Sequence, residues 1–145
     1  MRPSEVRRQV LADHAALRDK LSRLEEVAQQ VLEGERKLLG TLRLEGEALL
    51  KMLLEHIQWE DVNLDPALRR SDAWGDERAA QLARDHREQR ELLEHALRSL
   101  EDQTRPAVVL ARSLVDLVEL LGEDMADEEA ALLDARALRN DDEPG

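Results

Sequence analysis

The sequence predicts an all-α protein, an antiparallel up-down-up-down four-helix bundle, from its composition and its hydrophobic spacing. Hydrophobic residues make up 42% of the 145 residues but aromatic residues only 1%, so Leu, Ala and Val must fill the core, which favours helix over sheet. Gly (6) and Pro (4) are scarce and 37% of the residues are charged, as is typical of long amphipathic helices. Apolar residues recur in alternating steps of three and four along four segments with short connections, which indicates one bundle domain.

The first two segments predict a helical hairpin. One helix is expected to begin with Ser4 as its cap and to run toward Gly34, and the next to run from Leu39 to the NLDP stop, where Pro66 ends it. A single long helix through Gly34 is the alternative, but it would need a partner to bury its apolar face. The two predicted core faces are Val10, His14, Leu17, Leu21, Leu24, Ala28, Val31 and Leu39, Leu42, Gly46, Leu49, Leu53, His56, Glu60.

The last two segments predict a second hairpin. A third helix is expected to begin near Asp76, after the polar loop RRSDAWGD, and Thr104 and Pro106 separate it from a fourth helix. Their predicted core faces are Ala79, Leu82, His86, Gln89, Leu93, Ala96, Leu100 and Leu110, Leu114, Leu117, Leu121, Asp124, Glu128, Ala131. We expect the bundle to occupy residues 1–138 and residues 139–145 to form a disordered acidic tail.

Charge and cysteine usage exclude several function classes. The net charge of -12 argues against nucleic acid or an anionic membrane as a partner and favours cations. The chain has no cysteine, which excludes disulfides, thiolate metal sites and thiol nucleophiles. The longest apolar stretch is broken by Arg112 and Asp116, and MRPSEVRRQV lacks an apolar signal core, so a cytoplasmic protein is expected.

Titratable residues stand on the predicted core face of every helix. Burying so many such groups without compensation would be strongly destabilising, and a metal centre is the simplest compensation. Imidazole nitrogens and carboxylate oxygens suit iron, manganese or zinc. The candidate metal ligands are His14, His56, Glu60, His86, Asp124 and Glu128.

The spacing of these residues places them at one level of the bundle. In a hairpin, residues equally far from the turn lie side by side. The residue midway between His14 and His56 is 35, at the first predicted turn, and the residue midway between His86 and Asp124 is 105, at the last predicted break. Six ligands exceed the needs of one ion, so a dinuclear site is expected, with carboxylates in the middle and imidazoles as terminal ligands.

The neighbouring polar and aromatic residues are expected to have structural roles or to face solvent. A lone histidine on a core face is more often a hydrogen-bonded core residue than a ligand, so each signal is weak singly. His95 falls on the opposite face from His86 and is expected to be exposed. Trp59 and Trp74 are expected to pack near the site. Solvation is expected for four acids that flank the core face, although one could replace a neighbour as ligand: Glu55, Asp61, Asp127 and Glu129.

Four segments of the chain resemble the hemerythrin-like (HHE cation-binding) family. They are LADHAALRDKL around His14, EHIQWEDVNLDP around His56 and Glu60, RDHREQRELLE around His86, and EDMADEEAALLD around Glu128. The resemblance implies a four-helix bundle with a non-haem di-iron centre, two irons per chain, bridged by Glu60 and Glu128. It also implies dioxygen or peroxide as the small ligand, in oxygen or iron sensing, iron handling or detoxification.

Two positions depart from the family pattern. The family usually has His where this chain has Asp124, and oxygen-carrying members have a second His where this chain has Arg90. A carboxylate in place of an imidazole adds negative charge, which stabilises the ferric state and argues against reversible oxygen transport. Arg90 could neutralise part of that charge, or its guanidinium could occupy a metal position.

Two functions therefore follow from the sequence. The first is a metal-binding protein with His14, His56, His86 and Asp124 as terminal ligands. The alternative is a metal-free bundle that acts as a structural or protein-interaction module, with Arg90 and the acids in a buried ion-pair network. No substrate pocket, nucleophile or general base can be identified from the sequence, so enzymatic activity and any protein partner stay open.

Overall fold

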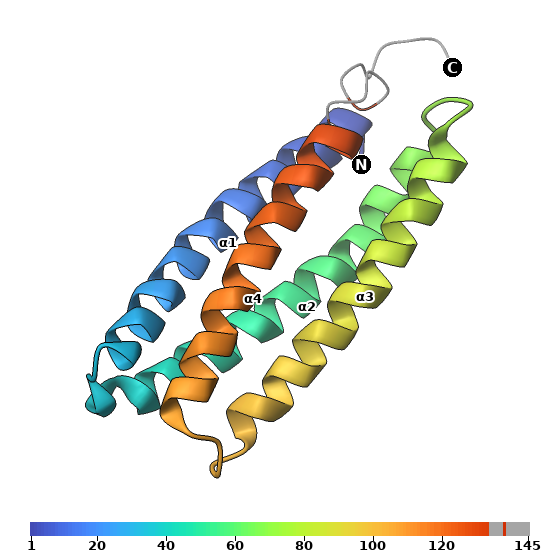
Figure 1. Cartoon of the computed structure of the whole chain (residues 1–145). Helices are drawn as coiled ribbons and strands as arrows, with labels where there is room; N and C mark the ends of the chain where they lie inside the picture. Colours follow the sequence, from blue (N-terminus) through green and yellow to red (C-terminus); the bar gives the residue numbers. More distant parts are fainter. Residues whose placement is uncertain (134–137, 139–145) are drawn as a thin grey trace.

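The computed structural model describes residues 1–133 and 138, which form four long helices (Figure 1). The described residues contain no strand, which confirms the predicted all-α bundle. The predicted acidic tail, 139–145, lies outside the described residues. The helices are α1 (Pro3–Leu32), α2 (Leu39–Arg69), α3 (Gly75–Glu101) and α4 (Ala107–Glu128), with a 3₁₀ turn at Arg36–Leu38 and a π-helical turn at Glu129–Leu133.

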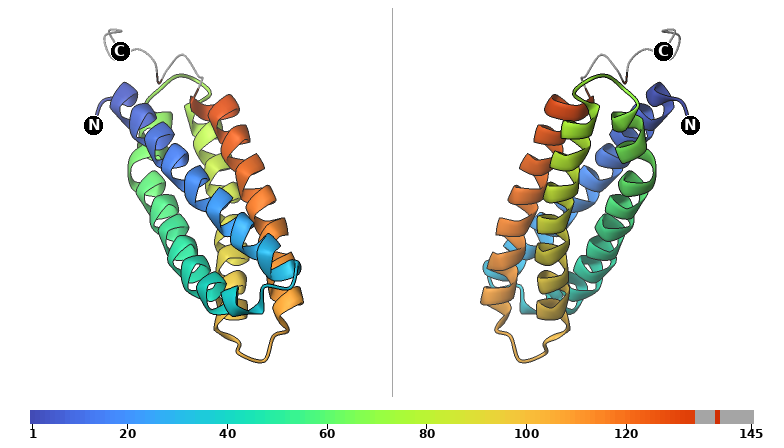
Figure 2. Two further views of the ribbon diagram at one scale, coloured as in Figure 1. Left: turned by 90° about the vertical axis from the view of Figure 1, so that its left-hand side faces the viewer. Right: turned by 90° about the vertical axis from the view of Figure 1, so that its right-hand side faces the viewer.

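The helices alternate in direction along the bundle. Figures 1 and 2 show the N-terminus, the α2–α3 loop and the end of α4 at one end, with the other two turns at the opposite end. We call these the terminal end and the hairpin end. The turn between α1 and α2 contains Gly34, whose φ of 109° is a conformation that residues with a Cβ rarely adopt. The hairpin at Gly34 is thus confirmed, and the single long helix is wrong.

Two predicted helix boundaries are wrong. Arg2, not Ser4, caps α1, because Pro3 suits the first helical position and the Glu5 carboxylate accepts a hydrogen bond from the Arg2 backbone N–H at 2.9 Å. Pro66 does not end α2, which continues to Arg69. The turn after Pro66 carries Ala67 and Leu68, and burying these two residues in the core favours its helical conformation.

The apolar core consists of two clusters separated by a polar layer. The larger cluster extends from the hairpin end, and the smaller one, which includes Val10, Leu64 and Leu82, lies toward the terminal end. On α1 the clusters are separated at His14, on α2 at Glu60 and on α3 at His86. The apolar faces of three helices are therefore interrupted at one level of the bundle, as predicted from the distances of these residues to the turns.

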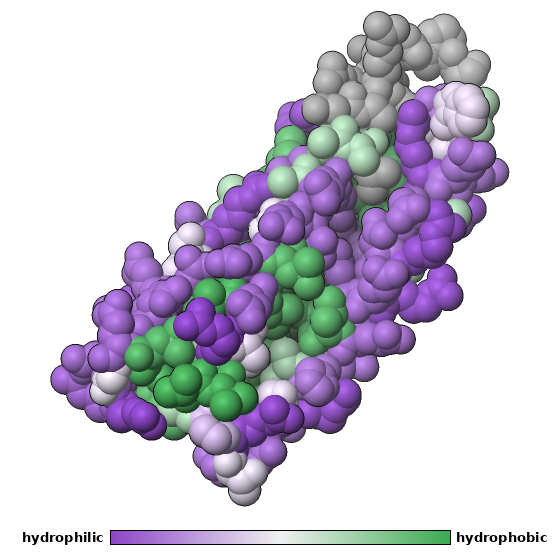
Figure 3. All heavy atoms as spheres, in the orientation of Figure 1, coloured by the Kyte–Doolittle hydropathy of each residue, from purple (hydrophilic) through white to green (hydrophobic). Residues whose placement is uncertain are grey.

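The spacing between neighbouring helices is uneven. Helix α1 packs closely on α2 and α4, and α2 packs closely on α3, whereas α3 and α4 make few close approaches. Figure 3 shows that the visible face is largely hydrophilic toward the terminal end and that apolar side chains gather toward the hairpin end. Within the described residues, no helix combines the length and the apolar character needed to cross a membrane.

Candidate metal centre

Four of the six predicted ligands converge in the polar layer. Ligand atoms of His14, His56, Glu60 and Glu128 all lie within 4.8 Å of one another. They come from α1, α2 and α4, and the rings of His14 and His56 pack edge to face with their centroids 5.1 Å apart. His14 and Glu60 are each only 1% exposed. The sequence prediction that distant helices bring these groups together agrees with this geometry.

The Glu60 carboxylate lies between two imidazoles. Its Oε1 lies 3.0 Å from His86 Nε2, and its Oε2 lies 3.5 Å from His56 Nε2. The same carboxylate also contacts Glu128, whose Oε1 lies 3.3 Å from His14 Nε2. Each oxygen of Glu60 thus faces a different histidine, an arrangement suited to a carboxylate that bridges two cations.

Each of the three histidines turns its other nitrogen outward to a carboxylate. His86 Nδ1 lies 2.7 Å from Asp61, His14 Nδ1 lies 3.3 Å from Glu129, and His56 Nδ1 lies 3.4 Å from Asp13. Such outer carboxylates orient metal-binding imidazoles by holding the proton on the nitrogen that does not face the metal. All three imidazoles therefore present Nε2 to the centre.

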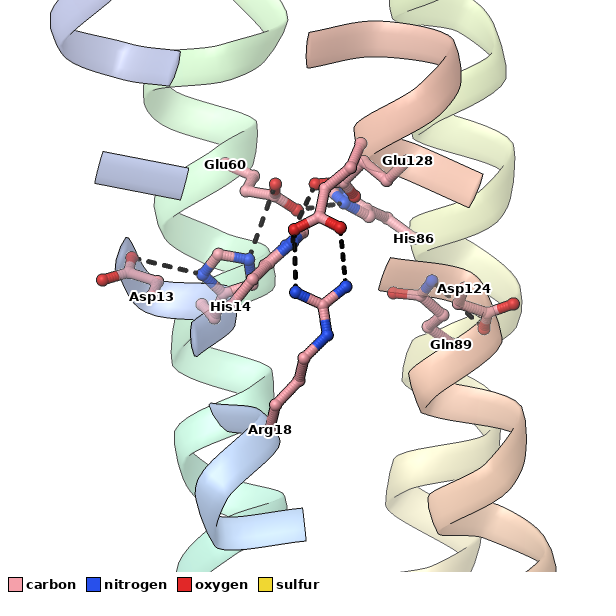
Figure 4. A network of polar contacts seen from close by, with 10 residues as sticks. Asp13, His14, Arg18, Glu60, His86, Gln89, Asp124 and Glu128 are labelled. Carbon is pink, nitrogen blue, oxygen red and sulfur yellow. Dashed lines mark hydrogen bonds and ion pairs between the residues drawn. The ribbon is translucent and has the colours of Figure 1, made fainter. Parts of the chain in front are cut away.

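Two arginines hold two of these outer carboxylates in place. Arg18 donates to both oxygens of Glu129, at 2.9 and 2.6 Å. Figure 4 shows Arg18 beside the centre, with two dashed lines from its guanidinium. Arg90 pairs with Asp61. The Arg90 guanidinium thus lies on the outer side of His86, where it compensates the charge of Asp61, and not among the inner carboxylates.

The pKa values of the glutamates and histidines of the centre are shifted because these groups are buried and lie close together. Burial alone would raise the pKa of Glu60, but contacts with Glu128 and two histidines hold that pKa well below its usual range. Burial, together with the Glu60 carboxylate, raises the pKa of Glu128 to about 11. Burial lowers the pKa of His14, whereas nearby carboxylates outweigh burial and raise the pKa of His56 and His86. The carboxylate pair retains one proton unless a cation compensates both charges.

Unpartnered polar atoms test whether a metal suits these residues. Buried atoms without a hydrogen-bond partner in the described part of the chain include both ring nitrogens of His56, Oε2 of Glu60 and Oε1 of Glu128. The His56 contacts at 3.4 and 3.5 Å are within ion-pair distance but do not have hydrogen-bond geometry. Leaving such atoms unpaired is costly, and a cation at the centre would satisfy those that face it, namely His56 Nε2, Glu60 Oε2 and Glu128 Oε1. The donor set fits iron, manganese or zinc.

Asp124 lies apart from the group of four. Its Oδ2 accepts a long hydrogen bond, 3.4 Å, from the Gln89 amide of α3 (Figure 4). It still lines the cavity of about 20 Å³ at the centre, together with His14, Glu60 and Glu128. Burial raises the pKa of Asp124, and nearby Asp127 adds to the effect. The structure thus places Asp124 at the edge of the centre.

Several flanking residues differ from their predicted environment. His95, Glu55 and Asp127 are exposed, as predicted. Asp61 and Glu129 are only partly exposed, and both also contact histidines of the centre, which the expected solvation did not include. Trp59 packs beside the smaller core cluster, whereas the packing predicted for Trp74 is wrong, since this residue lies in the α2–α3 loop and is 61% exposed.

Sequence reasoning did not single out Asp13 and Arg18. The signal that could have found the outer carboxylates is adjacency: Asp13, Asp61 and Glu129 each stand next to a predicted ligand in the sequence. A shift of one residue turns a side chain about 100° around the helix, toward a neighbouring helix. Each outer carboxylate therefore serves a histidine of another helix.

The comparisons with known proteins address the family. The family described as "Hemerythrin HHE cation binding domain" matches residues 6–135 of the chain. This range includes all six predicted ligands and the three outer carboxylates. Comparisons with curated proteins and with solved structures find no significant match.

Proposed function

The chain belongs to the hemerythrin HHE cation-binding family, and from this premise we propose that it holds two carboxylate-bridged iron ions that react with dioxygen or peroxide. The observation that carries this proposal is the convergence of His14, His56, Glu60 and Glu128 within 4.8 Å. The unpartnered atoms of three of these residues support it, because a cation would satisfy them. Iron, when bound, would supply a redox-active Lewis acid.

The two proposed cation positions differ in their protein ligands. The first uses the group of four residues defined above. The second would be held by His86, the two glutamates and Asp124, whose side chain now accepts a hydrogen bond from Gln89. Because the second position is the less complete one, we expect its cation to bind more weakly.

The size of the cavity supports a small ligand. A volume of about 20 Å³ is close to the space that one water molecule needs. Leu17, Ile57 and Leu93 line it together with the polar groups and limit the access of water. A space of this size is too small for a substrate of more than a few atoms. We accordingly favour sensing, iron handling or detoxification over chemistry on a larger substrate, with the cytoplasm as the proposed compartment.

The position of Arg90 weakens the alternative of a metal-free interaction module. That alternative expects Arg90 and the acids to form one buried ion-pair network. Arg90 does pair with Asp61, but this contact lies outside the inner carboxylates. The inner atoms of Glu60 and Glu128 consequently have no cationic side chain to compensate them, apart from the histidines, within the described residues.

Anaerobic titration with Fe(II) tests the proposal. Wild-type protein should bind up to two irons and, at a hundredfold excess over Kd, gain about 2.7 kcal/mol, which raises Tm by on the order of 8 °C. Glu60→Gln, which preserves the size of the side chain, should abolish this gain, and His95→Ala on the exposed face of α3 should retain it. Fewer than one iron per wild-type chain together with an unchanged Tm would eliminate the proposal.

A further inference from the structure

A groove between α3 and α4 runs over the terminal half of the bundle. Its volume is about 370 Å³, and it lies where these two helices make few close approaches. No Lys or Arg is among the described residues that line it. Five carboxylates line it: Asp85, Glu88, Asp124, Asp127 and Glu128.

This groove meets the cavity at the metal centre. Gln89, Asp124 and Glu128 line both spaces, and the 3.4 Å hydrogen bond between Gln89 and Asp124 spans the gap between the two helices at their junction (Figure 4). Beyond the junction lies Glu60, 1% exposed, whose Oε2 has no hydrogen-bond partner in the described chain. A buried acceptor that lacks a partner therefore stands at the inner end of an acidic path.

A second groove, between α1 and α2, reaches the same centre from another side. It is lined by His56 and Trp59 and carries two carboxylates, Asp13 and Glu55. Asp13 faces His56 Nδ1 at 3.4 Å, which is within ion-pair distance. The groove between α3 and α4 thus has the higher density of carboxylates, and a cleft lined by one sign of charge attracts counter-ions and raises their association rate.

We propose that the groove between α3 and α4 is the route by which divalent cations reach the metal centre, with Asp85 and Asp127 attracting them at its mouth and Asp124 transferring them at its inner end. The proposal rests on the metal centre proposed above. Carboxylate oxygens placed one after another along the groove suit a hydrated divalent ion, because each can replace one of the bound water molecules as the ion moves inward. The long bond from Gln89 leaves Asp124 easily released toward the incoming cation.

Stopped-flow mixing with Co(II), followed by its visible absorption, tests the route. The double variant Asp85→Asn/Asp127→Asn should slow association at low ionic strength by about three- to tenfold and weaken the dependence of the rate on salt. Because a route affects association and dissociation alike, Kd at about 0.15 M salt should stay within roughly threefold of the wild-type value. The matched control Glu94→Gln/Glu119→Gln removes two exposed charges from the same helices outside the groove and should leave the rate nearly unchanged.

The Kd of the metal and its rate of association test two different things: the Kd tests the proposed metal centre, and the rate tests the route to it. If wild-type protein binds no Co(II) and no Fe(II), the metal centre itself is wrong. If it binds them with the expected Kd but the groove variant loads as fast as the control, only the route is wrong. Slower loading in Glu55→Gln, with no effect of the groove variant, would instead assign access to the groove between α1 and α2.

Discussion

If His86 binds a cation as proposed, replacing Asp61 with Asn should weaken the binding of that cation. Asp61 accepts the shortest of the three outer contacts, 2.7 Å from His86 Nδ1, while Nε2 of the same ring faces Glu60. Loss of such an outer partner typically costs ten- to a hundredfold in metal affinity, or about 1.4–2.7 kcal/mol. Because this contact is short, we expect a loss toward the upper end of that range, measured by anaerobic calorimetric titration with Fe(II).

The same reasoning ranks the other outer carboxylates. Glu129 lies 3.3 Å from its histidine, and Asp13 lies 3.4 Å from His56 without hydrogen-bond geometry. Asp13→Asn should therefore cost about tenfold or less. The control for Asp61→Asn is Glu55→Gln, an exposed acid of the same helix.

A variant of Arg90 tests whether the Asp61 carboxylate acts by orienting His86 or needs its ion pair with Arg90 to do so. Arg90→Gln removes the partner of Asp61 but leaves the carboxylate beside His86, so its affinity should fall less than that of Asp61→Asn. Equal losses in Asp61→Asn and Glu55→Gln, or an affinity of Asp61→Asn within twofold of wild type, would refute the orienting role. Urea unfolding of each metal-free variant shows whether a lower affinity reflects only a less stable fold.

Three further predictions concern protons and packing. Since the pKa of Glu128 is raised to about 11, this carboxyl is protonated in the metal-free protein at neutral pH; cation binding should release that proton, together with any that His56 and His86 carry, and the affinity should rise at least about tenfold per pH unit, as calorimetry in buffers of different ionisation enthalpy will show. Gly75→Ala should destabilise the fold by about 1–3 kcal/mol in urea unfolding, because its Cβ would lie 2.0 Å from the Leu68 carbonyl oxygen, whereas Gly122→Ala meets nothing within 4 Å and should be neutral or stabilising. Leu64→Ala, at a fully buried position of the smaller core cluster, should cost about 2–5 kcal/mol in the same assay.

Periodicity was sufficient to predict the bundle, because burial follows the helical repeat. His14, Glu60 and His86 were located from the spacing of apolar residues alone, and each is 1% exposed. The level at which they meet followed from turn positions, which Gly34 and Pro106 indicate directly. These features depend only on local sequence and on the fixed rise of a helix, so they can be predicted from one sequence.

Features that depend on the side chains of a second helix could not be predicted in this way. Asp61 and Glu129 are next to core-face residues, and the helical period alone assigns them to solvent. Their contacts with histidines of other helices depend on which pair of helices packs closely, and this requires the three-dimensional arrangement. The continuation of α2 past Pro66 has the same origin, because the burial of Leu68 outweighs a local signal to stop.

The outer carboxylates also explain how the centre accommodates Arg90, which stands where oxygen-carrying members of the family have a second histidine. A guanidinium among the ligands would repel cations, but Arg90 extends to Asp61, and Arg18 extends to Glu129. Both arginines keep an outer carboxylate ionised and fixed, which in turn holds an imidazole with Nε2 inward. The negative charge that Asp124 adds at the edge of the centre would then be left for the proposed cations to compensate. Such a charge favours ferric over ferrous iron, so we expect oxidation of the bound metal to be favoured over reversible binding of dioxygen.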